Sequence, residues 1–364
     1  MTEHLQAWRR GRLGRIRLNR PGALNALTLD MLHAFDRALN DFIADPEIVA
    51  VHVDGAGERA FCAGGDIRLL YDKRDSAPDF YKQFWRVEYP LNARIAALPK
   101  PCLVLMDGLV MGGGVGLSAH ASHRLVTPRT RFAMPETQIG FLPDTGGSWL
   151  LGRRGAAGAY LALTGATIGA GDVLRLALAD YCVDPERLAE LEHKLSQATG
   201  PEEIGSILDM ARTPPPPPKV TVHENLLARA FGRVSVDETI GVLEEQEDGF
   251  AKETLEHLLR ASPTSLKLTR RLLTLAASGT NLETALINEY RAACGLLNSH
   301  DLYEGIRAAI IDRDKNPRWS PDVLSAVEDS AIDALLRGTG DPDPEFRCEN
   351  TGHGHSQSVR LRPS

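Results

Sequence analysis

The stretch FAMPETQIGFLPDTGG, residues 132–147, places two acids, Glu136 and Asp144, in a segment that is otherwise uncharged. Each acid directly follows a proline, and two glycines close the segment. Partial burial raises the pKa of a carboxyl group, which suits it to proton transfer or to attack on a carbonyl carbon. Two acids of a surface loop are the alternative interpretation, and this stretch alone does not separate the two.

Two glycine-rich turns lie earlier in the chain, FCAGGDI at 61–67 and MGGGVG at 111–116. Each follows a strand-like run and opens onto a helix-like run, so each presents free backbone N–H groups at the start of a helix. Two such groups converging on one point would form an oxyanion hole, which stabilises negative charge on a carbonyl oxygen. Packing glycines with an ordinary helix cap are the alternative.

The order strand, glycine turn, helix recurs several times, as in AVHVDGAG and PKPCLVLMDG, and predicts an α/β protein. The stretch GAGDVLRLALADYCV, residues 169–183, is predicted to be helical throughout. PPPPP at 214–218 interrupts the pattern and favours a stiff connector over a ligand for a proline-binding domain. We therefore predict a catalytic core over 1–210, a proline-rich connector over 211–234, a helical C-terminal region over 235–330 and a disordered tail over 340–364.

Two further patterns carry open alternatives. Six arginines between Arg9 and Arg20 alternate with apolar residues and turn glycines, which favours the solvated faces of a hairpin over an anion site. An apolar stripe at helical spacing over 282–297 suits either a core or a contact between subunits, so a homo-oligomer is possible.

Composition excludes several classes of protein. The net charge of −7 offers no basic excess for nucleic acid. No apolar run approaches the ~18 residues of a membrane span. The five cysteines are odd in number, widely spaced and without C-x-x-C, so we expect neither a disulfide framework nor a zinc site, and no metal or cofactor is predicted. Without an apolar signal segment at its start, the chain is predicted to be cytoplasmic.

Ordered blocks of the chain resemble the crotonase (enoyl-CoA hydratase/isomerase) superfamily: LNRPGALNAL, AFCAGGDI, MDGLVMGGGVGLS and FAMPETQIGFLPDTGG. Further blocks, YLALTG, ASPTSLKLT and HDLYEGIRAAIIDRDKNPRWSP, are most similar to its 3-hydroxyisobutyryl-CoA hydrolase branch. The resemblance spans residues 5–322 and lapses around the polyproline segment. It implies a core of repeated ββα turns, a helical C-terminal region, and a short-chain 3-hydroxyacyl-CoA thioester as substrate, with hydrolysis serving valine breakdown.

The resemblance also implies roles for individual residues. The oxyanion-hole amides fall on Gly65 and Gly113, and the catalytic acids on Glu136 and Asp144. Glu136 would activate water or attack the thioester itself. Glu88 would join Gly113, Glu136 and Asp144 in contacting the acyl group. The resemblance places CoA against Ala63, Asp66 and Lys315, with Arg313 beside the last of these.

One departure bears on the reaction. Hydratases of this superfamily use two acids around one water; one matches Glu136 and the other falls at position 116, which is glycine in this chain. This favours hydrolysis over the alternative of enoyl-CoA hydration or isomerisation. A non-catalytic acyl-CoA-binding protein is a third possibility, which the intact acids and glycine turns disfavour.

Overall fold

The computed structural model describes residues 3–346. Its larger sheet has six strands in the order β1-β2-β3-β5-β7-β10. β1 and β2 form an antiparallel hairpin, and the remaining neighbours pair in parallel. These strands are β1 (Leu5–Arg10), β2 (Leu13–Leu18), β3 (Ala50–Gly55), β5 (Cys102–Met106), β7 (His123–Val126) and β10 (Tyr181–Cys182).

A second sheet of four short strands runs in the order β4-β6-β8-β9. Its members are β4 (Ala60–Cys62), β6 (Leu109–Met111), β8 (Arg131–Ala133) and β9 (Ile168–Gly169). Three times in succession, one strand of the large sheet is followed by one strand of the small sheet and then by helical turns. The predicted ββα repeat is therefore confirmed, and each repeat delivers a turn to the same side of the small sheet.

Helices follow each pair of strands. They are α1 (Leu29–Ala44), α2 (Ile67–Lys73), α3 (Phe80–Ala96), α4 (Gly113–Ser118), the 3-10 turn η2 (Glu136–Ile139), α5 (Gly147–Gly152), α6 (Gly155–Thr164), α7 (Ala170–Arg175), α8 (Leu188–Ser196) and α9 (Glu202–Ala211). All five residues of β5 are buried, as expected of a parallel strand covered on both faces. Thr28 caps α1, whose buried face includes Met31, Phe35 and Leu39.

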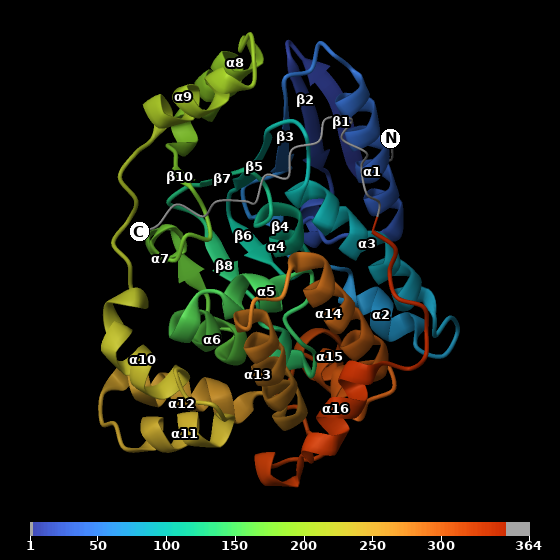
Figure 1. The fold of residues 1–364 in the computed structure, drawn as a ribbon, viewed down its shortest axis with the longest axis vertical. Coiled ribbons are helices and arrows are strands. Elements are labelled where there is room, and N and C mark those ends of the chain that lie inside the picture. Colours follow the sequence, from blue (N-terminus) through green and yellow to red (C-terminus); the bar gives the residue numbers. More distant parts are fainter. Residues whose placement is uncertain (1–2, 347–364) are drawn as a thin grey trace.

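The C-terminal half is helical, as predicted, and gathers below the strands in Figure 1. Its helices are α10 (Glu224–Phe231), α11 (Val236–Glu244), α12 (Gly249–Arg260), α13 (Pro263–Ala277), α14 (Leu282–Leu296), α15 (His300–Ile306), the π-helical turn η5 (Arg307–Ile311) and α16 (Asp329–Arg337). The range 211–234 holds α10 as well as the extended prolines. The apolar stripe of α14 packs inside the chain, against α3, α5, α13 and α16.

Two expectations are wrong. Residues 169–183 are not one helix, because α7 ends at Arg175 and Tyr181–Cys182 form the edge strand β10. The arginines near the start do not all face solvent, because Arg15 is fully buried and donates a 2.6 Å hydrogen bond to Asp54. A buried guanidinium needs such a partner, and sequence alternation alone does not reveal one that lies 39 residues away.

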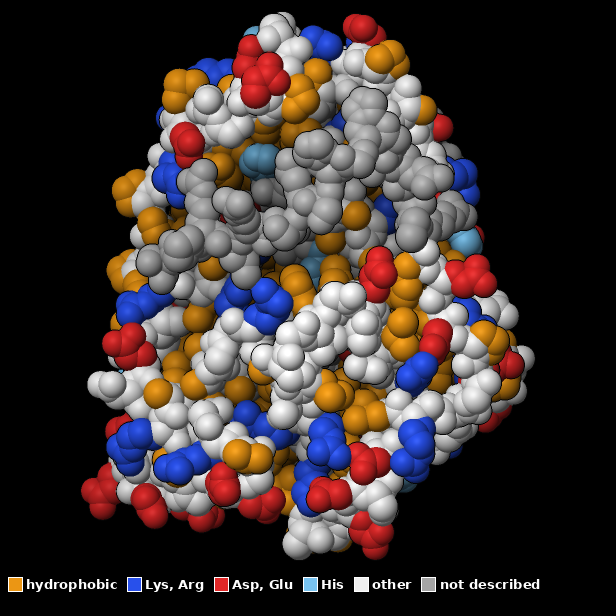
Figure 2. All heavy atoms as spheres, in the orientation of Figure 1, with side chains coloured by type: hydrophobic (Ala, Val, Ile, Leu, Met, Phe, Trp, Pro, Cys, Tyr) orange, Lys and Arg blue, Asp and Glu red, His pale blue; other side chains and the backbone are white. Residues whose placement is uncertain are grey.

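The described part of the last segment, up to residue 346, contacts the helices. Asp341 pairs with Lys82 at 2.9 Å and Asp343 with Arg291 at 2.6 Å. The expectation of disorder over 347–364 concerns residues outside the described range. Acidic and basic side chains are interspersed over the face seen in Figure 2. Within residues 3–346, no helix is long and apolar enough to cross a membrane.

Candidate active site

A cavity of about 530 Å³ opens where the glycine turns, α3, η2 and the C-terminal elements α15 and η5 meet. Its wall is mainly apolar, with a few polar groups, which is typical of a small-molecule site. Most residues predicted to act on or bind the substrate line it: Ala63, Gly65, Glu88, Gly113, Glu136, Asp144 and Lys315. Asp66 and Arg313 do not line it; the carboxylate of Asp66 instead caps α2 and pairs with Arg20 at 3.1 Å.

The two glycine turns meet at this cavity. Gly64 and Gly112 have φ of +101° and +50°, a backbone region that glycine adopts without a steric penalty. A methyl group built on Gly113 would lie 3.5 Å from the amide nitrogen of Gly65. Within residues 3–346, neither the Gly65 nor the Gly113 N–H donates a hydrogen bond to another protein group. Two free amides therefore lie side by side at one end of the cavity.

Glu136 begins the turn η2, close to the glycine turns. A methyl group built on Gly112 would lie 3.2 Å from its Oε1. The side chain is buried, and its Oε2 has no hydrogen-bond partner among the described residues. Burial, reinforced by the charge of Asp144, raises the pKa of Glu136 well above its ordinary value. A buried carboxyl oxygen without a protein partner is available to a ligand or to water.

Asp144 is buried beside Glu136, and burial raises its pKa to about 7. The Tyr89 hydroxyl donates a 2.8 Å hydrogen bond to Oδ2 of Asp144, which opposes that rise. The charge of Asp144 disfavours ionisation of Glu136, so the two carboxyl groups hold their protons differently. Such a pair can supply one acid and one base to a reaction.

Glu88 projects from α3 into the same cavity and is almost fully buried, so it is not a solvated acid of the helix surface. Its Oε1 has no partner among the described residues and faces Cα of Gly113. Burial, followed by the charge of Asp144, raises its pKa well above the ordinary value. A neutral carboxyl group at this place can both donate and accept a hydrogen bond.

Glu289 of α14 is a further buried acid, which the sequence reasoning missed. It accepts hydrogen bonds from the amides of Gly146 at 2.7 Å and Ser148 at 3.0 Å, and so fixes the loop that follows Asp144. That loop includes Thr145 with φ of +56°, which is unusual for a β-branched residue. The sequence does carry a signal for Glu289: it is an acid on the apolar face of the helix predicted over 282–297.

Position 116 has no room for a side chain. A methyl group there would lie 2.6 Å from Cβ of Thr145 and 2.7 Å from Nδ2 of Asn92. Both distances are shorter than real Cβ contacts allow. The absence of an acid at this position is thus built into the packing around α4.

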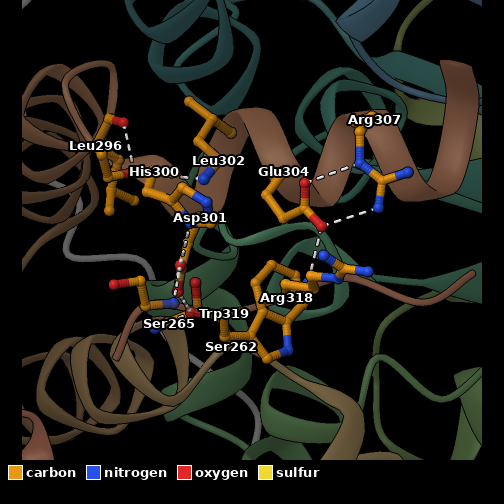
Figure 3. A network of polar contacts seen from close by, with 12 residues as sticks. Ser262, Ser265, Leu296, His300, Asp301, Leu302, Glu304, Arg307, Arg318 and Trp319 are labelled. Carbon is orange, nitrogen blue, oxygen red and sulfur yellow. Dashed lines mark hydrogen bonds and ion pairs between the residues drawn. The ribbon is translucent and has the colours of Figure 1, made fainter. Parts of the chain in front are cut away.

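The mouth of the cavity is formed by the C-terminal elements. Arg260 of α12 and Lys315, which follows η5, both line it. Figure 3 shows the polar network behind this rim, in which Asp301 accepts a 2.6 Å hydrogen bond from Ser262. Among the described residues, no group of three or more His, Cys, Asp or Glu side chains is arranged to hold a metal ion.

Known proteins are similar to this chain over most of its length. The family model described as enoyl-CoA hydratase/isomerase matches residues 13–336. The mitochondrial 3-hydroxyisobutyryl-CoA hydrolase of Mus musculus is 39% identical over 346 residues, which are 93% of this chain and 90% of that protein. The Homo sapiens protein of the same name is 38% identical over 95% of this chain and 91% of its own length.

Two crystal structures are also similar over nearly the whole chain. A carnitinyl-CoA dehydratase from Mycobacterium thermoresistibile has a TM-score of 0.90 at 35% identity and covers 96% of this chain and all of its own. An enoyl-CoA hydratase from Rhodobacter sphaeroides has a TM-score of 0.87 at 39% identity and covers 94% of this chain and all of its own. The names of these relatives span hydrolysis, hydration and dehydration, so the choice among reactions depends on the site itself.

Proposed function

The chain belongs to the enoyl-CoA hydratase/isomerase family, and from this premise we propose that it hydrolyses a short-chain 3-hydroxyacyl-CoA thioester, most specifically 3-hydroxyisobutyryl-CoA. The observation that carries the proposal is the unpartnered carboxyl of Glu136 beside the free amides of Gly65 and Gly113. The products would be 3-hydroxyisobutyrate and CoA, in the breakdown of valine.

The proposed reaction begins when the thioester carbonyl oxygen accepts hydrogen bonds from both glycine amides. In one route, Glu136 takes a proton from water, and the water oxygen attacks the carbonyl carbon. In the other, the Glu136 carboxylate attacks directly, the C–S bond breaks to give a mixed anhydride and CoA thiolate, and water then hydrolyses the anhydride. In both, negative charge develops on the oxygen held by the amides, where each donor contributes on the order of 10²–10³ in rate. In the first route the C–S bond breaks after the attack of water. In both routes the CoA sulfur leaves as a thiol with a proton that water supplies through Glu136 or Asp144.

Asp144 has a pKa of about 7, so it can orient Glu136 or the water, or handle the second proton transfer. Glu88 is placed to recognise the acyl hydroxyl, because a neutral carboxyl donates a hydrogen bond to a hydroxyl oxygen and accepts one from its hydrogen. The apolar wall around Phe84, Trp85 and Phe141 suits a short branched chain and excludes bulk water.

Hydration of an enoyl-CoA is the second candidate, favoured by the name of the Rhodobacter sphaeroides structure. It requires a second acid at the water, and the space at Gly116 is filled by Thr145 and Asn92. A non-catalytic acyl-CoA-binding protein is the third, and the strongly raised pKa values of three buried acids argue for chemistry instead.

A thiol-release assay over a panel of CoA thioesters tests the proposal. We expect free thiol from 3-hydroxyisobutyryl-CoA and 3-hydroxypropionyl-CoA, more slowly from isobutyryl-CoA, and no loss of enoyl absorbance from crotonyl-CoA. Loss of that absorbance without thiol would establish hydration instead. Tight binding of CoA with no thiol from any ester would establish a binding protein.

The setting in the cell is a proposal as well. Four of the cysteines, Cys62, Cys102, Cys182 and Cys294, are free and buried, which supports a reducing compartment such as the cytoplasm. The vertebrate relatives carry mitochondrial in their names. A homo-oligomer also stays a prediction, which the mass of the purified protein in solution would test.

A further inference from the structure

The chain that leaves η5 carries basic residues past the mouth of the cavity in a strained conformation. Arg313 and Lys315 have φ of +60° and +54°, a region that side chains other than glycine seldom adopt. Lys315 lines the cavity, as does Arg260. Strain of this kind persists only where surrounding contacts over-determine the backbone, and it concentrates at ligand-binding segments.

Arg307 supplies those contacts. Its guanidinium binds Glu304 through two hydrogen bonds of 2.8 Å, Asp312 at 2.6 Å and Asp314 at 2.7 Å. Glu304 in turn accepts a 2.8 Å hydrogen bond from the amide of Arg318, as Figure 3 shows. One side chain of the π-helical turn thereby holds both ends of the segment 312–318.

Arg307 also sets the charge of this segment. Asp312 and Asp314 alternate with Arg313 and Lys315, and Arg318 follows, so the two acids offset two of the three positive charges of the segment. Arg307 pairs with both carboxylates and so reduces their repulsion of an anion that approaches Lys315 at the cavity. Without that pairing, two carboxylates next to Lys315 would repel an incoming anion.

We propose that Arg307 is a positioning residue for the phosphate-bearing end of the substrate: it orders the 312–318 segment and pairs with its acids, so that Lys315 faces the phosphates. The inference rests on the proposed function, since it takes the substrate to be a CoA thioester. Arg307 itself does not line the cavity, so it acts through the segment it holds.

The test compares two thioesters of the same acyl group, one of CoA and one of pantetheine, which lacks every phosphate. Arg307→Gln should raise KM for the CoA ester about tenfold, the size of one charge-assisted contact, and leave kcat within twofold. Its KM for the pantetheine ester should match that of the unaltered protein. An equal rise for both esters, or no rise for the CoA ester, would overturn the proposal.

Arg187→Gln is the matched control, because Arg187 makes the same two-pronged contact to Glu190 but lies away from the cavity. It should change neither KM. Adding Asp312→Asn and Asp314→Asn to Arg307→Gln removes the unmasked acids and should recover most of the lost affinity, which a purely architectural role would not do. If the unaltered protein releases no thiol, the proposed function fails. Calorimetric titration with CoA and with pantetheine then tests Arg307 alone: Arg307→Gln should weaken the binding of CoA and leave the binding of pantetheine unchanged.

Discussion

The Tyr89 hydroxyl lies 2.8 Å from Oδ2 of Asp144 and donates a hydrogen bond to it, although both groups are buried. The bond stabilises the ionised form of Asp144 and so lowers a pKa that burial has raised to about 7. The two effects together place the titration of Asp144 near neutral pH, where it can take up or release a proton.

Tyr89→Phe should therefore move the pH dependence of activity in a defined direction. Loss of the donor raises the pKa of Asp144 further, so the acid limb of kcat/KM, expected near pH 7, should shift upward by about one pH unit. The measurement is the pH profile of thiol release for both proteins. A limb that stays in place or moves to lower pH would show that Asp144 does not control it.

Asp144→Asn should stabilise the fold while it impairs activity. A carboxyl whose pKa rises from 3.8 to about 7 on folding costs stability as pH rises between those values, and the full penalty, a few kcal/mol, applies above pH 7. The thermal midpoint should thus increase more at pH 8 than at pH 5. The exposed Asp322→Asn is the control and should show no such difference, whereas an equal gain at both pH values for Asp144→Asn would show that the raised pKa of Asp144 is not the source of the gain.

Glu88→Ala should weaken the preference for hydroxylated substrates. If Glu88 recognises the acyl hydroxyl, kcat/KM for 3-hydroxyisobutyryl-CoA should fall by about 10- to 100-fold, and the value for isobutyryl-CoA should change far less. The ratio of the two values is the quantity to measure. A parallel loss on both esters would assign Glu88 to the chemistry or to the fold rather than to specificity.

Gly116→Glu should not create a hydratase. The new Cβ would be forced against Thr145 and Asn92, so we expect a loss of about 1–3 kcal/mol in stability and no hydration of crotonyl-CoA. Gly116→Ala, which adds the Cβ alone, separates the packing cost from the effect of charge. Efficient hydration by the glutamate variant would show that reaction choice rests on this one position.

Local pattern predicted the features of the fold and site that local chemistry controls. Glycine turns after apolar strands indicated free backbone amides at the starts of helices, because both features follow from adjacent residues. The pattern around Glu136 indicated an acid that is buried or lies in a surface loop, and did not separate the two. Assignment of the amides to Gly65 and Gly113, and of Glu136 to the site, came from the resemblance. The resemblance to known blocks then connected these separate turns to one site.

Features that depend on distant segments were not predictable in this way. Glu289 reaches the loop after Asp144 from a helix more than 140 residues later, and Tyr89 reaches Asp144 across 55. Arg15 is buried because Asp54 stands on the neighbouring strand, which the alternation around it does not disclose. In each case a buried polar group is satisfied by a partner that only the tertiary fold brings near.

Glu136→Gln tests whether Glu136 acts as the base or nucleophile in thioester hydrolysis. The substitution keeps the size of the side chain and removes its capacity for either role. With 3-hydroxyisobutyryl-CoA, we expect kcat for thiol release to fall by at least about 10³-fold, while the affinity for CoA and the thermal midpoint stay near those of the unaltered protein. Thiol release at a near-normal rate by this variant would contradict the central role of Glu136.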